Sequence, residues 1–185
     1  MPRVADVSVM RRVLVVLVAS AVLGALAPAA SSAPHSTAIE RRSALERAIG
    51  RELNRVRIAQ ELKPLRFGDG LRAAAAQHSR SMLEDGYFEH ESADGTSFDA
   101  RIKRFYSDRG WHNWAVGEAL LSSSAEISAR EIVSTWLDSR PHREVIMSRL
   151  YRDGGVGVFY ASSASGDFGD EPALVVTADF GQRQR

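Results

Sequence analysis

The stretch GVGVFYASSASGDFGDEPALVVTADF, residues 155–180, decides the fold class of this chain. Apolar side chains recur at every second position near both of its ends, at Val156, Val158 and Tyr160 and then at Leu174, Val176, Ala178 and Phe180. A period of two is typical of β-strands, and the Ser-, Gly- and Asp-rich segment 162–171 between them is typical of a loop. We therefore expect an antiparallel pair of strands at the end of the chain.

Helical patterns precede this pair. Apolar residues recur three or four positions apart in the ranges 45–56, 71–82 and 127–136, and a shorter helix is expected from 97 to 105. Residues 115–121 are expected to form one more strand. Helices followed by strands that can pair antiparallel predict an α+β layered domain.

Three segments carry the residue types that begin helices. Thr37-Ala-Ile-Glu40 and Ser123-Ser-Ala-Glu126 both fit the capping-box pattern. Ser139-Arg-Pro-His142 combines a capping serine with a proline suited to a first helical turn. We expect one helix to begin at each segment.

Composition and charge argue against a nucleic-acid-binding protein and against a fold held by disulfides. The chain has 185 residues, of which 44% are hydrophobic and 25% charged, which is enough for one domain with its own core. Its formal net charge is +1, so we expect no nucleic-acid partner. It contains no cysteine, so the core has to hold the fold without disulfides. We expect a monomer.

The first 30 residues are interpreted as a secretory signal peptide. Arg11-Arg12 precedes the apolar run 13–30, and Ala27-Pro-Ala29 fits a signal-peptidase site. An uncleaved anchor helix is the alternative, although the apolar run is slightly short for a membrane span. We predict a linker at 31–40, a domain at 41–183, no membrane span after removal of the signal, and a secreted or extracytoplasmic location.

Five short motifs follow in order along the chain, namely Phe88-x-His90, Gly117-Glu118, Trp136-x-x-Ser139-x-x-His142-Arg143, Gly155-Val-Gly157 and Asp179-Phe-Gly181. Their order resembles the bacterial SCP-domain branch of the CAP superfamily, the cysteine-rich secretory, antigen 5 and pathogenesis-related 1 proteins. The resemblance extends from about Ala44 to Gly181.

The resemblance implies an α-β-α sandwich with a small central antiparallel sheet, and a cleft that carries two histidines and two acidic residues. His90 and His142 correspond to the histidines, and Glu118 corresponds to one of the acids. Ser139 stands where the family has its second acid. Ala119 stands where the family motif has asparagine.

The implied cleft residues leave several chemistries open. Two imidazoles and a carboxylate form a reasonable set for a divalent metal, so weak Zn²⁺ binding by His90, Glu118 and His142 is one hypothesis. Alternatively, the same side chains hydrogen-bond one another and fasten loops to the sheet. Ser139 lies three residues before His142 and invites a serine-hydrolase interpretation, but no G-x-S-x-G motif is present and a helix cap is favoured.

Three functions follow from these alternatives. The first is an exported binding module whose cleft, with Ser139 beside the His/Glu set, holds a metal, a lipid, a small apolar molecule or a cell-envelope fragment. The second is a metal-assisted hydrolase that uses the same cleft. The third is a scaffold with a vestigial cleft. The sequence leaves open whether the protein is an enzyme.

Two groups of residues outside the motifs receive structural interpretations. His78 falls on the apolar stripe of the second helical pattern and is expected to be a core histidine. Arg101, Lys103 and Arg104 are expected to form a solvated helix face.

Overall fold

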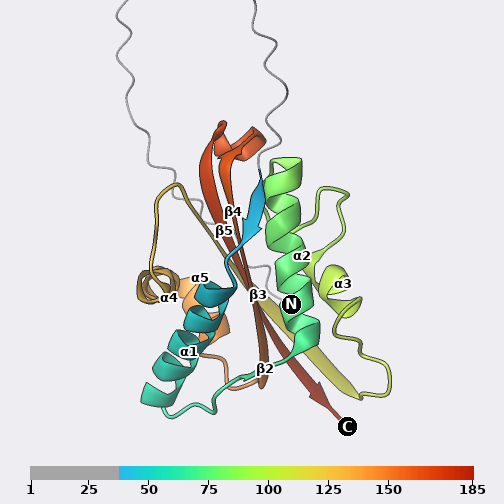
Figure 1. The fold of residues 1–185 in the computed structure, drawn as a ribbon. Coiled ribbons are helices and arrows are strands. Elements are labelled where there is room, and N and C mark those ends of the chain that lie inside the picture. The colour runs from blue at the N-terminus through green and yellow to red at the C-terminus, as the bar shows by residue number, and fades with distance from the viewer. Residues whose placement is uncertain (1–37) are drawn as a thin grey trace, which may run out of the picture. The chain divides into compact units, whose positions relative to one another are not determined.

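A central sheet organises the domain (Figure 1). The computed structural model describes residues 38–185, so the predicted signal segment 1–30 lies outside the described residues. Four antiparallel strands lie in the order β1-β4-β5-β3, namely β1 (Ile39–Arg41), β4 (Asp153–Ala164), β5 (Glu171–Gln184) and β3 (Asn113–Ser123). The two-residue strand β2 (Arg66–Phe67) pairs with β4 in parallel. The strands predicted at the end of the chain are the central pair, β4 and β5.

Helices cover both faces of this sheet. Within residues 38–185 they are α1 (Ser43–Ala59), α2 (Asp69–Asp85), α3 (Phe98–Lys103), α4 (Ala129–Asp138), α5 (Arg140–Ile146) and the short 3₁₀ helix η1 (Gly166–Phe168). Helices α1, α4 and α5 pack on one face, and α2 and α3 pack on the other (Figure 1). The predicted α+β sandwich with a central antiparallel sheet is confirmed.

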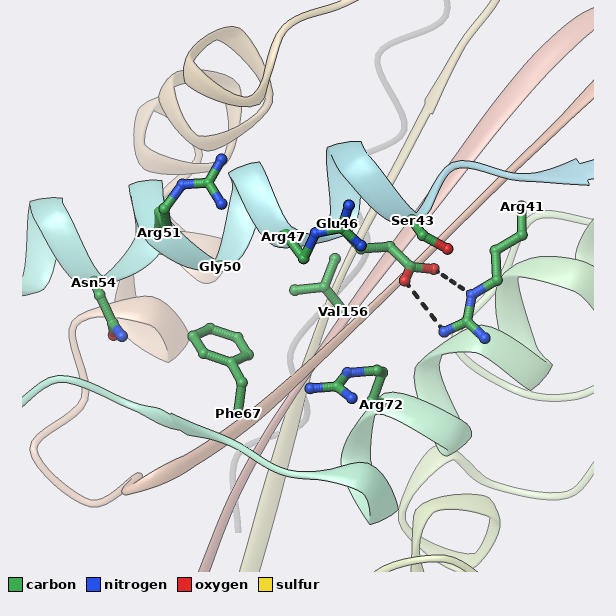
Figure 2. A pocket seen from close by; sticks show the side chains of 10 residues that line it. All are labelled: Arg41, Ser43, Glu46, Arg47, Gly50, Arg51, Asn54, Phe67, Arg72 and Val156. Atoms are coloured by element: carbon green, nitrogen blue, oxygen red, sulfur yellow. Dashed lines mark hydrogen bonds and ion pairs between the residues drawn. The ribbon is translucent and has the colours of Figure 1, made fainter.

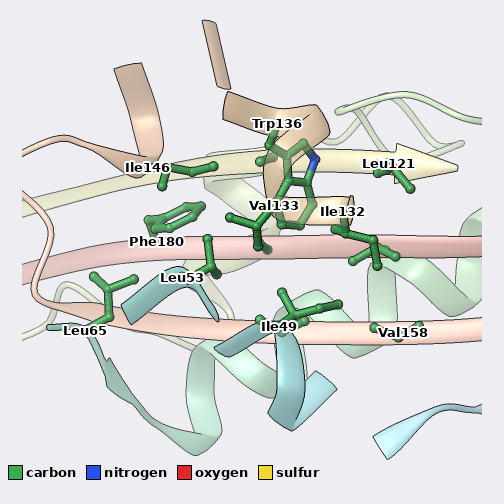
Figure 3. Close-up of a cluster of buried hydrophobic side chains, with 14 of the residues drawn as sticks. Ile49, Leu53, Leu65, Leu121, Ile132, Val133, Trp136, Ile146, Val158 and Phe180 are labelled. Carbon is green, nitrogen blue, oxygen red and sulfur yellow. The ribbon is translucent and has the colours of Figure 1, made fainter. Parts of the chain in front are cut away.

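Trp136 of α4 lies in the core between the sheet and the first group of helices (Figure 3). Its side chain is fully buried, and its indole N–H donates to the carbonyl oxygen of Leu120 on β3 at 2.9 Å. An unpaired buried N–H would cost about 1–3 kcal/mol, so this bond allows the large ring to be buried. The contact fixes α4 against β3, the strand that carries Glu118.

Glycines on β4 let α2 approach the opposite face closely. A Cβ atom at Gly155 would lie 2.1 Å from the backbone of Leu71, and one at Gly157 would lie 2.4 Å from the backbone of Ala75. Both obstacles are helix backbone, which cannot move aside as a flexible side chain could. The absence of side chains at these two positions therefore sets how close α2 lies to the sheet.

The N-terminal edge of the domain differs from the sequence prediction. Residues 39–41 pair with residues 159–161 of β4, so β1 overlaps the predicted linker 31–40, and α1 begins at Ser43. Of the predicted capping segment, Thr37 lies outside the described residues, and Ile39 and Glu40 belong to β1 and not to a helix. The capping pattern is overridden because the open edge of β4 offers backbone hydrogen-bond partners.

Another capping prediction is displaced by five residues. Ser128, not Ser123, caps α4, since its hydroxyl accepts the Glu131 backbone N–H and the Glu131 carboxylate accepts the Ser128 N–H at 2.9 Å. Ser123 instead ends β3, which is longer than the predicted 115–121 because its pairing with β5 continues to Leu174.

Replacing Gly157 with alanine tests the close approach of α2. We expect a loss of about 3 kcal/mol in the free energy of unfolding, because the new methyl group meets helix backbone. Gly68→Ala is the matched control, since nothing lies within 4 Å of its Cβ position, and it should cost under about 1 kcal/mol. Urea denaturation of both variants makes the comparison, and equal stabilities would contradict the packing argument.

Candidate functional site

Glu118 lies in the interior on the face of the sheet covered by α2 and α3. Its neighbour Gly117 faces α5, where a Cβ would meet Val145 at 3.1 Å, and consecutive strand residues point to opposite faces. The Glu118 side chain is only 1% exposed. Directly across the ladder stands Asp179 of β5, which is fully buried on the same face. Two carboxyl groups thus share one dry region of the core.

Arg101 of α3 neutralises this region. Its guanidinium, itself 1% exposed, donates to Glu118 Oε2 and also to the backbone oxygen of His90 at 2.8 Å. The expectation of a solvated basic face is therefore wrong for Arg101. A short helix has two sides, and the core-facing side of α3 carries Ile102 and this arginine. The ion pair joins α3, β3 and the loop that carries His90.

His90 is the member of the cluster that reaches solvent. Its Nδ1 lies 2.8 Å from Glu118 Oε1, and its side chain is 40% exposed. Because an ionised carboxylate only accepts hydrogen bonds, Nδ1 carries a proton, and in the neutral form of the ring the lone pair is therefore on Nε2. The ring of Phe98 lies 6.2 Å away, centroid to centroid. This surface offers a hydrogen-bond acceptor beside an aromatic ring.

His78 of α2 lies beneath this cluster. Its Nε2 donates to the backbone oxygen of Glu89 at 2.9 Å, which leaves Nδ1 to accept from the Tyr87 hydroxyl at 3.5 Å. Burial lowers the pKa of His78 to about 4. The negative charge of Glu118, 4.0 Å from Nε2, opposes this lowering but is the smaller effect. His78 is confirmed as a core histidine, and its bonds show that it also holds the loop at Glu89.

The two buried carboxyl groups titrate in opposite directions. Burial favours the neutral form of Glu118, but the hydrogen bond from His90 and the charge of Arg101 outweigh it and hold its pKa below the ordinary value. Burial and the negative charge of Glu118 raise the pKa of Asp179 well above the ordinary value. One negative charge, on Glu118, therefore faces Arg101, and Asp179 stays protonated.

Two predicted cleft residues lie elsewhere. His142 is in the first turn of α5, a helix that packs on the opposite face of the sheet through Ile146. Ser139 joins α4 to α5 as the N-cap residue of α5, and its side chain makes no capping hydrogen bond there. The structure thus brings His90 and Glu118 together and places His142 and Ser139 on the other helical layer.

The described side chains do not fit the predicted zinc site. Glu118 has one oxygen bonded to His90 and the other to Arg101, so a metal would have to displace both. In the part of the chain that the structure describes, no group of three His, Asp or Glu side chains is arranged to hold a metal ion. The Glu118 carboxylate instead holds the His90 and Arg101 side chains in place by hydrogen bonds.

Arg101 and Asp179 are site residues that were not predicted from the sequence. One signal was present for Asp179, since it and Thr177 occupy the positions of β5 between the predicted apolar ones. No role was predicted for these two polar residues, which α2 buries against the sheet. Arg101 lies near the end of a short helix whose inward side has too few residues for a clear period.

Comparisons with known proteins found a matching family and a bacterial relative. The model of the cysteine-rich secretory protein family, CAP, matches residues 51–180. Over 136 residues the chain is 32% identical to the Bacillus subtilis (strain 168) "Uncharacterized protein YkwD", covering 73% of this chain and 48% of that protein. The chain therefore spans about half the length of this relative.

Solved structures share the fold. An extracellular protein containing an SCP domain from Bacillus anthracis matches with a TM-score of 0.59 at 20% identity, over 77% of this chain and 41% of that one. An outer surface protein from Borrelia burgdorferi matches with a TM-score of 0.61 at 20% identity, over 80% of this chain and 99% of that one. Within residues 38–185, no helix is long and apolar enough to cross a membrane.

Arg101→Met tests whether the ion pair holds the cluster together. Removing one partner leaves Glu118 buried and uncompensated, so we expect a loss of about 3–5 kcal/mol in the free energy of unfolding. Lys103→Met is the control, because Lys103 pairs with Asp108 at the surface and should cost at most about 1 kcal/mol. Chemical denaturation at pH 7 provides the measurement. Similar losses in the two variants would show that Arg101 is dispensable.

The lowered pKa of His78 predicts a pH dependence of stability. The unfolded chain protonates this residue below about pH 6.5, whereas the folded chain keeps it neutral down to about 4. The contribution of His78 to stability is thus complete above about pH 6.5 and falls by up to about 1.4 kcal/mol per pH unit as the pH decreases toward 4. The raised pKa of Asp179 acts in the opposite direction, so the effect of His78 is measured as the difference between a His78 variant and the unmodified protein.

Denaturation at pH 7, 6 and 5 measures this decrease. His78→Gln should show a shallower decline than the unmodified protein, whereas the exposed His112→Gln should decline as steeply as the unmodified protein. The lowered pKa of Glu118 contributes mainly below its ordinary value of 4.5, outside this range. Parallel pH profiles for His78→Gln and the unmodified protein would refute the assignment.

Proposed function

The chain belongs to the cysteine-rich secretory protein family, CAP, and we propose that it is an extracytoplasmic binding module that contacts its ligand through His90. Export by the N-terminal signal segment, action as a monomer and the absence of a nucleic-acid partner are parts of this proposal. The extracellular and outer-surface descriptions of two proteins with this fold support the location.

One observation carries the proposal. Glu118 orients the His90 ring through Nδ1 at 2.8 Å, and the side chain is 40% exposed, so the neutral form of the ring has Nε2 as an acceptor for a ligand. The loop beneath is held at two successive backbone oxygens, by His78 at Glu89 and by Arg101 at His90. Such prior ordering reduces the entropy that a ligand would otherwise lose on binding.

The chemistry of this surface favours a fragment of the cell envelope. A sugar hydroxyl or a peptide N–H can donate to Nε2, and the neighbouring Phe98 ring suits the apolar face of a sugar. A purely apolar lipid would leave Nε2 without a donor. We therefore place sugar- or peptide-bearing envelope material ahead of the lipid and metal ligands.

The hydrolase alternative is less well supported. It needs a metal-bound water, and both oxygens of Glu118 are already engaged by His90 and Arg101. The scaffold alternative is favoured by the same contacts, since they fasten a loop to the sheet. The exposed acceptor on His90 distinguishes the binding module from a scaffold.

Co-sedimentation with purified bacterial cell-wall sacculi tests the proposal. We expect the full chain to be retained, His90→Gln to bind about tenfold more weakly after loss of the ring acceptor, and the exposed His112→Gln to bind like the unmodified chain. A chelator should leave retention unchanged, because the described residues do not form a zinc site.

Two results would overturn the proposal. The first is no retention of the full chain on sacculi. The second is equal retention of His90→Gln and the unmodified chain, provided that thermal unfolding shows both to be folded. Retention that depends on added zinc and on His90 would restore the metal-binding alternative.

A further inference from the structure

A separate pocket lies at the other edge of the sheet, between α1 and the β4 edge (Figure 2). Its volume is about 520 Å³. The residues that matter most are four arginines, Arg41, Arg47, Arg51 and Arg72, and the apolar Phe67 and Val156. Glu46 is its only acidic lining residue among residues 38–185. The pocket therefore has a strong excess of positive charge in a molecule that is almost neutral.

The four arginines are not equally engaged. Arg41 donates to both oxygens of Glu46 at 2.9 and 3.1 Å, so these two charges compensate each other. Arg72 pairs with Asp69, whose side chain is 99% exposed, and such a surface pair contributes little. Arg47 and Arg51 have no hydrogen-bond or ion-pair partner in the described part of the chain. These two guanidinium groups remain available to a ligand.

The backbone of β4 adds hydrogen-bonding groups to this wall. The backbone of Val158 faces away from β5: its carbonyl oxygen accepts from Arg42 N at 2.9 Å, and its N–H donates to Glu46 Oε1 at 3.1 Å. The carbonyl oxygen of Gly154 accepts from Gly68 N at 3.2 Å in the same direction. Alternate strand residues turn their N–H and C=O groups to the same edge, so those of Val156 also face outward. Val156 lies between the segments paired by β1 and β2, and it lines the pocket.

We propose that this pocket binds a phosphate-bearing ligand of the size of a phosphosugar or a lipid headgroup. Arg47 and Arg51, with Arg72, provide the charge, and planar guanidinium groups match phosphate oxygens with paired donors. The outward Val156 N–H is a further donor. The Phe67 ring packs against Gly50 in the middle of α1 and gives the uncharged part of the ligand an apolar contact.

This site goes beyond the envelope-binding function proposed for His90. His90 contacts Glu118 on β3, whereas the arginine pocket adjoins β4 on the side of β1 and β2, and β5 separates the two strands. The two proposals can thus fail or succeed independently, since the variants that test one leave the other surface unchanged.

NMR titration of the full chain with glycerol 3-phosphate tests the site directly. We expect the backbone amide signals of Gly50 and Val156 to shift with ligand concentration, and the shifts to decrease as salt is added, since salt screens exposed charges. Arg47→Gln with Arg51→Gln should weaken binding by at least about tenfold, because each charge-assisted hydrogen bond contributes substantially. Arg55→Gln is the control, because Arg55 lies on α1 outside the pocket and pairs with Glu52.

Flotation with vesicles distinguishes the two sources of phosphate. Binding to phosphatidylglycerol vesicles but not to phosphatidylcholine vesicles, lost in the double variant, would identify a lipid headgroup. Shifts with glycerol 3-phosphate and no flotation would identify a soluble phosphosugar or phosphopolyol. Either result supports the site.

The proposal is overturned if glycerol 3-phosphate leaves the Gly50 and Val156 signals unchanged and the vesicles do not bind. It is also overturned if the double variant and Arg55→Gln bind either probe as the unmodified chain does. The amide shifts are measured on the unmodified chain, so the test does not depend on whether the double variant folds.

Discussion

The Glu118 carboxylate has to be accommodated on a strand that is covered on both faces, where water cannot solvate its charge. An isolated buried carboxylate is so costly that it is either neutralised or surrounded by partners. Arg101 and His90 are these partners, and Asp179 opposite stays protonated because it is fully buried and because Glu118 already carries a negative charge. The positions of α3, of the loop at His90 and of β5 are thereby tied to one side chain.

Close packing of α2 and the polar cluster depend on each other. Gly155 and Gly157 bring α2 near the sheet, and this distance places His78 within 4.0 Å of Glu118. His78 then holds Glu89 while Arg101 holds the adjacent carbonyl of His90. A tightly packed interior thus orders a surface loop, which is how an exposed residue can have a fixed orientation without lying on a helix or strand.

Much of the fold could be predicted because its signals are local. The alternation in 155–160 and 174–180 identified β4 and β5, and the helical periods located α1, α2 and α4. The helix caps were less predictable, since Thr37 and Ser123 have the same residue pattern as Ser128. Pairing with β4 and β5 draws residues 39–40 of the first segment and Ser123 of the second into strands, and this pairing is not encoded within four residues.

The sequence by itself determined the layered α+β class, because periodicity is a property of short stretches of chain. Its ordered motifs singled out His90 and Glu118 only through their resemblance to a known family. Only the tertiary structure decided that Arg101 and Asp179 join them, that His142 lies on the helical layer of the opposite face, and that Arg47 and Arg51 border a pocket. Burial and electrostatic pairing depend on distances between segments that lie far apart in the sequence. Those distances exist only once the helices have packed on both faces of the sheet.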